Sequence, residues 1–396
     1  MSDPAPSTST RSPILWGAYL ACSWTWCIGL FLPVLLLRDM GWPGFWIFAI
    51  PNVIGAAAMG WIIKTRSGSA HFVENHARAI WWFSAVTLAF HLYWILWLTS
   101  FIPAVLGIPA SYLAGCLGFV GVFALIASRT IRLRKAPQTA FVLLVLSLCV
   151  LIGTTLSSDL QEANVFLQGS VQHSAAPLWM LPVMLFGFLL CPYLDITFHY
   201  ARQQLDSTQK SRLGFTLGFV GFFSFMILLT TRYAGKLAGA MNGMECSPII
   251  SPWLASGILI HILCQWFFTV SVHLDRMRTL PGAESKKTRL AVLLIGAAII
   301  GVLAPGLPAY RGLLGGEIGY RLFMTAYGLI FPAYMLYRVI ARRKNPTGRQ
   351  PTMWIAIALT APFLWMGFIE RQPVWLLPGM ALILCIAIIH PKKPSS

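Results

Sequence analysis

The chain has 396 residues, of which 57% are hydrophobic and only 10% are charged. Soluble domains carry about 25% charged residues, so a chain of this length could not cover a water-exposed surface with so few. The composition therefore excludes a water-soluble protein. It predicts an all-α polytopic membrane protein whose main partner is the lipid bilayer.

Apolar runs about 20 residues long, enough to cross a bilayer, recur along the whole chain. Before them, residues 1–12 are polar and lack the apolar core of a signal peptide, so we expect a cytoplasmic N-terminus. The sequence predicts about twelve spans, namely 13–37, 42–63, 79–103, 105–128, 138–158, 177–201, 213–233, 249–275, 290–308, 316–340, 352–370 and 373–390. Residues 391–396 form a short polar tail.

The basic residues alternate between the two sides of these spans. With the N-terminus inside, 23 of the 29 Lys and Arg residues fall on the inner side. This excess predicts a cell (inner) membrane protein with both termini in the cytoplasm. The six on the outer side are Arg38, Arg232, Lys236, Arg311, Arg321 and Arg371.

The net charge of +17 follows from these inner loops, which lie beside anionic lipid, and does not indicate nucleic-acid binding. Eight cysteines are scattered without the spacing of a disulfide framework or a zinc site. We therefore expect no cofactor and no enzymatic activity. A sodium ion or a proton remains possible as a coupling ion.

The centre of the first span is polar. Ser23 and Thr25 can donate hydroxyls there, Gly29 permits unwound backbone, and Pro33 follows. Such interruptions are tolerated in membranes where the freed backbone groups line a cavity. A continuous helix with hydroxyls bonded to its own carbonyls is an equally good interpretation.

The sixth span carries a stronger interruption. Pro192 removes a helical hydrogen bond, and Asp195 follows within one turn. A carboxylate at the centre of a span costs about 2.5–3.5 kcal/mol, so a bound cation, a proton or an Arg must stabilise it. The alternative to a binding role is a structural ladder of Asp195, His199 and Arg202 on one helix face.

Two further spans hold candidate residues. The third carries His91 and Trp94, and the eighth carries Thr269 and Ser271. An ionisable residue inside a span is a functional candidate by default. A buried neutral His, and Ser or Thr bonded between helices, are the plainer interpretations.

Interruptions in the first and sixth spans, five apart and opposite in direction, resemble the inverted repeat of the LeuT-fold (amino acid–polyamine–organocation) superfamily of transporters. The run Pro192–Arg202 is similar to the broken sixth helix of nucleobase–cation symporters. More loosely, the chain resembles sodium–solute symporters. Phe198 and His199 stand where the nucleobase–cation motif has Arg and Tyr, so the match is partial.

The resemblance implies a single transmembrane domain over 13–390, with repeats at 13–158 and 177–340 and accessory helices at 352–390. It implies that a solute contacts Trp24, Thr25, Tyr193 and Asp195, to which we add His91 and Trp94 of the third span as candidate contacts. It also implies a sodium site made by Cys22, Ser23, Thr269 and Ser271.

Three classes of function follow. The favoured one is a secondary transporter that couples a cation to symport of a small-molecule organic solute. A second is a non-transporting sensor or assembly subunit with a transporter-like shell. A membrane-embedded transferase is disfavoured because the candidate acids and bases are dispersed along the sequence. The sequence does not indicate the oligomeric state.

Overall fold

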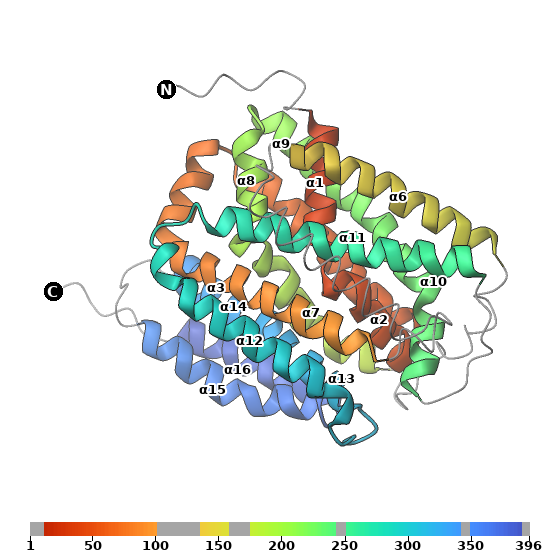
Figure 1. Ribbon diagram of the computed structural model, residues 1–396. Coiled ribbons are helices and arrows are strands. Elements are labelled where there is room, and N and C mark those ends of the chain that lie inside the picture. The colour runs from red at the N-terminus through yellow and green to blue at the C-terminus, as the bar shows by residue number, and fades with distance from the viewer. Residues whose placement is uncertain (1–11, 101–134, 158–174, 243–250, 342–348, 390–396) are drawn as a thin grey trace.

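The computed structural model describes residues 12–100, 135–157, 175–242, 251–341 and 349–389, and all its named elements in these ranges are helices (Figure 1). Nine helical stretches there are long and apolar enough to cross a membrane. The prediction of an all-α polytopic membrane protein is therefore confirmed. The protein is a multi-pass membrane protein.

The first half of the chain contributes α1 (Pro13–Trp24), α2 (Cys27–Ile62), α3 (Arg66–Leu98), α6 (Ala136–Leu156), α7 (Ala176–Leu190), η4 (Cys191–Leu194) and α8 (Ile196–Gln204). The second half contributes α9 (Thr208–Thr216), η5 (Leu217–Phe223), α10 (Ser224–Met241), α11 (Pro252–Met277), η6 (Glu284–Lys286), α12 (Lys287–Leu303), η7 (Ala304–Gly306), α13 (Gly315–Thr325), η8 (Ala326–Ile330), α14 (Phe331–Tyr334), η9 (Met335–Ile340), α15 (Arg349–Phe368), η10 (Pro373–Trp375) and α16 (Leu376–Ile389).

Eleven of the twelve predicted spans coincide with described helices. The fourth, 105–128, lies outside the described residues. α2 contains the second part of the first span and the whole of the second span, and Gly41, with a positive φ of 64° and non-helical backbone, separates the two. Only glycine adopts this backbone conformation at little cost.

The third span begins earlier than the apolar run does. α3 starts at Arg66, where the hydroxyl of Thr65 accepts a hydrogen bond from the Gly68 amide at 2.9 Å and caps the helix. Its polar first turns end at a kink at His76, and the apolar span follows. Hydropathy alone detects only the apolar part.

Small residues let the second span approach its neighbours closely. A Cβ added at Gly55 would lie 2.1 Å from the Phe188 carbonyl oxygen of α7, and one at Gly60 would lie 2.5 Å from the Phe215 ring. α2 therefore packs directly against the backbone of the sixth span. This contact holds α2 and α7 together.

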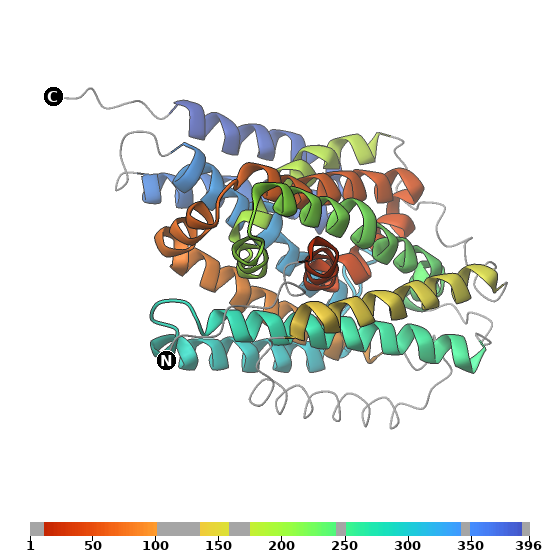
Figure 2. The same ribbon diagram turned by 90° about the horizontal axis from the view of Figure 1, so that it is seen from above.

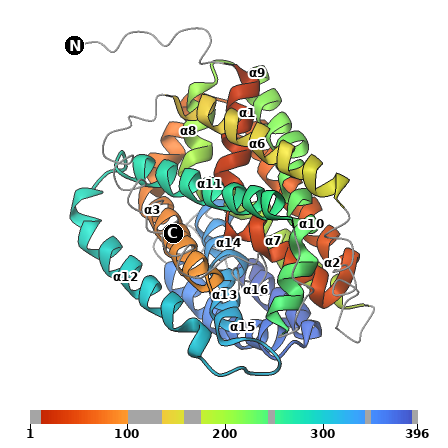
Figure 3. The same ribbon diagram turned by 45° about the vertical axis from the view of Figure 1, so that its right-hand side comes forward.

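The helices divide into a buried centre and a lipid-facing rim. α12 lies at the outer edge of the bundle and packs on α3 (Figure 3), and only 17% of its apolar window is buried. α11 runs beside α6 (Figure 2) and is 67% buried in its apolar window. α15 and α16 pair with each other at one side of the bundle. The centre is built by α1, α3, α8 and α11.

Candidate solute and ion site

The first span is broken at Thr25 and Trp26, between α1 and α2. Trp26 is extended, with φ −81° and ψ 178°, and Thr25 has also left the helical region. The interrupted interpretation of this span is therefore observed, and the continuous helix is not. Both residues are fully buried, at 0% and 1% exposure.

Side chains donate hydrogen bonds to the carbonyls of the last turn of α1 at this break. A helix end buried in a membrane needs such partners because lipid offers none. Four successive carbonyl oxygens accept a side-chain hydrogen bond: Leu20 from Ser23 at 3.1 Å, Ala21 from Thr25 at 2.8 Å, Cys22 from Thr269 at 3.2 Å, and Ser23 from the Trp26 indole.

His91 satisfies the other side of the same break. Its Nδ1 donates to the Thr87 carbonyl at 2.7 Å, which leaves Nε2 as an acceptor for the Cys27 amide at 3.4 Å. The Tyr320 hydroxyl donates to the Cys27 carbonyl at 3.0 Å. His91 thus acts as a cap for the buried start of α2 and has both ring nitrogens in use.

The sixth span is broken at Asp195. The short helix η4 contains Pro192, and Asp195 is extended, with φ −81° and ψ 114°, before α8 begins. Asp195 is the N-cap of α8, because its Oδ1 accepts from the amide and the hydroxyl of Thr197, both at 2.7 Å. The predicted interruption lies where Pro192 and Asp195 indicated.

The alternative ladder of Asp195, His199 and Arg202 is not formed. His199 bonds Ser69 at 2.9 Å and the Tyr193 carbonyl at 2.9 Å, and Arg202 donates to backbone carbonyls of residues 63, 64 and 205. Asp195 precedes the helix and so does not share a face with the two residues that follow.

The two breaks meet at the centre of the bundle. The Thr197 hydroxyl lies 3.2 Å from the Ser23 hydroxyl. Asp195 Oδ2 lies 3.8 Å from His273 Nε2 on α11, and both side chains are 0% exposed. Within the described residues neither atom has a hydrogen-bond partner, so an unsatisfied acid and imidazole face each other here.

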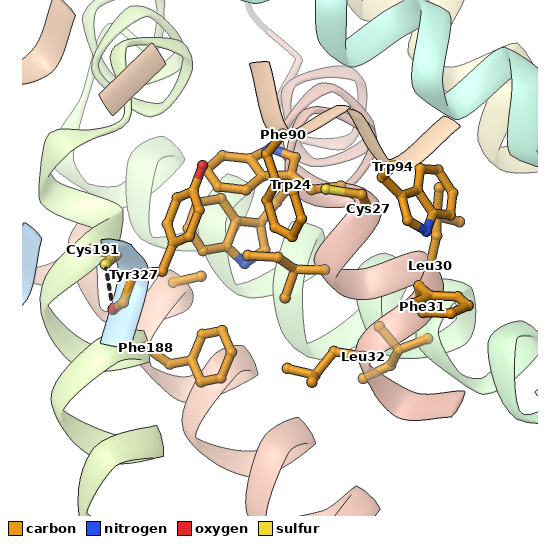
Figure 4. Packing of buried hydrophobic residues seen from close by; sticks show 14 of the residues in the cluster. Trp24, Cys27, Leu30, Phe31, Leu32, Phe90, Trp94, Phe188, Cys191 and Tyr327 are labelled. Carbon is orange, nitrogen blue, oxygen red and sulfur yellow. Dashed lines mark hydrogen bonds between the residues drawn. The ribbon is translucent and has the colours of Figure 1, made fainter. Parts of the chain in front are cut away.

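A cavity extends outward from this junction. Its inner end is formed by Trp24 and Trp26, and its other end reaches Asp39 and Arg321. The empty space within it, open mouth included, is about 970 Å³. Figure 4 shows the packing around it, with the Cys191 thiol bonded to a neighbouring carbonyl at 3.3 Å.

A network of ion pairs lies at the end of the cavity that we predict to be extracellular. Arg38 forms a bidentate pair with Glu317 at 2.6 and 2.9 Å and also bonds Asp39 at 2.9 Å. Arg321 bonds Asp39 and Glu317, each at 2.6 Å, and Arg371 reaches Asp39 at 3.4 Å. The outer halves of the first and tenth spans are thereby tied together.

The same network accounts for basic residues on the predicted outer side. Arg38, Arg321 and Arg371 are three of the six, and a fourth, Arg311, pairs with Glu370 at 3.1 Å. Four of the six are therefore held by acidic partners. Most of the remaining basic residues lie in the loops that we predict to be on the inner side.

The structure does not bring the six residues predicted to contact a solute together in one site. Trp24 lines the cavity and donates to Asn52 at 2.6 Å. The Thr25 hydroxyl faces Met226 at 3.3 Å, and Trp94 packs on Phe31. The remaining three, which lie at the breaks but outside the lining of the cavity, are Tyr193, Asp195 and His91.

The four predicted sodium ligands divide in the same way. Thr269 and the Cys22 carbonyl meet at 3.2 Å, whereas the Ser23 hydroxyl lies against Thr197 of α8. Ser271 is buried and its hydroxyl has no partner among the described residues. Residues two apart on a helix do not face each other, so Ser271 and Thr269 point in different directions.

Three features of the site were not found from the sequence. Trp26 lines the cavity and packs on His273 with ring centroids 5.6 Å apart, so it touches both the cavity and the buried pair. His273 faces Asp195 from 78 residues away in the chain. The Arg38–Glu317 pair joins residues 279 apart. Glu317, an acid inside a predicted span, was the available signal.

No family model matches the chain, and no curated protein matches it. Among solved structures, it is similar to a manganese transporter mutant from Eremococcus coleocola, with 14% identity over 95% of this chain and 90% of that one and a TM-score of 0.38. It is also similar to Mhp1, a nucleobase–cation symport family transporter, in a closed conformation with bromovinylhydantoin bound, with 16% identity over 96% and 86% and a TM-score of 0.36.

At such identities and TM-scores the likeness carries no argument about activity.

Proposed function

We propose that this protein is a secondary active transporter that couples a cation to symport of a small organic solute. The observation that carries the proposal is the meeting of two broken spans, in the middle of the bundle, at the inner end of a cavity. In many transporters, helix ends at such breaks hold the solute and the coupling ion. The open cavity favours transport over a sensor with a filled centre.

Two sites at the junction support cation coupling. The Cys22 carbonyl and the Thr269 hydroxyl offer oxygen atoms to a sodium ion. Asp195 Oδ2, without a partner among the described residues, offers a negative charge to sodium or takes up a proton. Sodium and proton coupling are distinguished by the gradient that drives uptake.

Uptake into reconstituted vesicles tests the proposal. Amino acids, nucleobases, sugars and uncharged aromatic compounds are screened with a sodium gradient, a pH gradient or neither, for wild type and Asp195→Asn. Asp206→Asn is the matched control, because Asp206 is partly exposed and pairs with Lys210. Gradient-driven uptake that is lost only in Asp195→Asn supports symport. Equal uptake with and without every gradient contradicts it.

A further inference from the structure

The cavity is lined almost entirely by apolar side chains. Its walls come from α2, α7, the tenth span and the turn between α15 and α16. Aromatic residues form much of the lining, and four methionines contribute flexible thioethers: Met40, Met180, Met184 and Met324. Methionine adapts to irregular apolar shapes, so this lining can close around ligands that differ in outline.

The polar atoms of the aromatic lining are already in use inside the protein. The indole of Trp24 donates to Asn52, and that of Trp26 donates to the Ser23 carbonyl. The two lining tyrosines are bonded as well: Tyr320 donates to the Cys27 carbonyl at 3.0 Å and Tyr327 shares a hydrogen bond with Thr87 at 2.9 Å.

The charged residues of the lining lie at the outer end and are engaged with one another. Arg321 uses all three of its guanidinium nitrogens, on Glu317, Asp39 and the Phe368 carbonyl at 3.1 Å. Asp39 in turn accepts from Arg38 and Arg371. A charged solute seated between Trp24 and Leu35 would therefore lose its water without gaining a partner.

We propose that the solute is an uncharged, largely apolar ring compound, which rests on the proposed transport function and names its substrate class. The aromatic walls offer ring faces for stacking, and burial of apolar surface supplies the affinity. Solute binding in the cavity affects the buried pair of Asp195 and His273 through Trp26, because the Trp26 ring lines the cavity and packs on His273.

Equilibrium binding to the full chain in lipid nanodiscs tests this class, with empty nanodiscs as the blank. The probe is radiolabelled naphthalene, and the competitors are naphthol, naphthoate and naphthylmethylamine, which share the ring and differ in charge. We expect saturable naphthalene binding and competition by naphthol. After correction for partition into lipid, the two ions are expected to compete at least about tenfold more weakly, since burial of an unpaired charge is costly.

A matched pair of variants on α7 locates the site. Met184 lines the cavity, whereas the neighbouring Leu185 does not line it and is 38% exposed. Met184→Trp is expected to lower naphthalene affinity about tenfold by filling the cavity, and Leu185→Trp to leave it unchanged. Leu35→Phe fills the opposite wall if Met184→Trp fails to fold, as judged by size-exclusion chromatography.

Each contrary result overturns the class. Tighter competition by naphthoate or naphthylmethylamine, absence of saturable naphthalene binding, or equal binding by both α7 variants would each do so. Gradient-driven uptake is measured separately and depends on Asp195. A charged solute taken up with Asp195 dependence would retain the transport function and reject the apolar class. Saturable naphthalene binding without gradient-driven uptake of any solute would reject transport and retain the site.

Discussion

The two broken spans differ in how completely their polar groups are satisfied. At the first break, side chains from α1, α3, α11 and α13 form hydrogen bonds with backbone groups on both sides. At the second, one oxygen of Asp195 is bonded and the other has no partner among the described residues. In this structure the backbone groups at the first break are thus bonded within the protein. At the second break Asp195 Oδ2 remains available to a cation or a proton, so we expect coupling there.

Replacing Asp195 in two ways tests this contrast most strongly. Both Asp195→Asn and Asp195→Ala should reduce gradient-driven uptake roughly 10- to 150-fold, the scale of losing a charge-assisted interaction. Asn remains a good N-cap, so only Ala should also lower the unfolding free energy, by about 1 kcal/mol. Vesicle uptake and thermal unfolding measure the two effects. Unchanged uptake in both variants would remove the distinction between the breaks.

Thr269→Val probes the joint at the first break. It leaves the buried Cys22 carbonyl without its side-chain donor, which should cost about 1–3 kcal/mol of stability. Thr155→Val is the matched control, because that hydroxyl is exposed and bonds its own helix at 2.7 Å. Thermal unfolding should show a clear loss only for Thr269→Val. Equal losses would mean that this joint is not specially dependent on its side-chain partners.

A smaller effect is expected for Trp26→Phe. The ring is largely retained in the cavity, while the donor to the Ser23 carbonyl is lost, at a cost of about 1 kcal/mol. Trp365→Phe provides a comparison at the surface, where the indole donates to Glu370 at 3.2 Å. If Trp365→Phe proved the more destabilising change, burial would not be what makes the first break depend on its donors.

The smallest effect is expected beyond the end of α15, at Glu370. The hydroxyl of Tyr310, which donates to it at 2.7 Å, lowers the pKa of Glu370, and Arg311 adds to the effect. A lowered pKa stabilises the fold above the ordinary glutamate pKa of about 4.3, and this contribution is lost as the pH falls through the lowered value. The difference in melting temperature between wild type and Glu370→Gln should shrink accordingly in acid. A difference that grows on acidification would show that the sign is wrong.

The positions of eleven spans and of the second break could be predicted from the sequence, because they depend on local properties, whereas for the first break the sequence left a continuous helix equally open. Hydropathy located the spans, and Pro192 with Asp195 located the second break. The ladder failed for a local reason as well. The ladder of Asp195, His199 and Arg202 requires all three residues on one helix face, but Asp195 caps α8 and does not lie on its face.

The partners across the bundle could not be predicted. His273 faces Asp195, and Arg38 faces Glu317, only because distant helices pack at particular angles. Nothing in the local sequence distinguishes His273 from His261, which is on the same helix but bonds Ser147 of α6 at 2.9 Å. For the same reason, the cavity walls follow from packing and not from any motif.

The place of Asp195 in the chain also bears on membrane insertion. The sixth span is synthesised before α11, so while it enters the bilayer its carboxyl group has Thr197 close by but not yet His273. A carboxylic acid at this depth disfavours insertion by about 2.5–3.5 kcal/mol. Two spans that are already made, α1 with its Ser23 hydroxyl and α2 with Gly55 against the sixth-span backbone, offer it a docking surface. The early spans therefore serve as an assembly template for the segment that carries the charge.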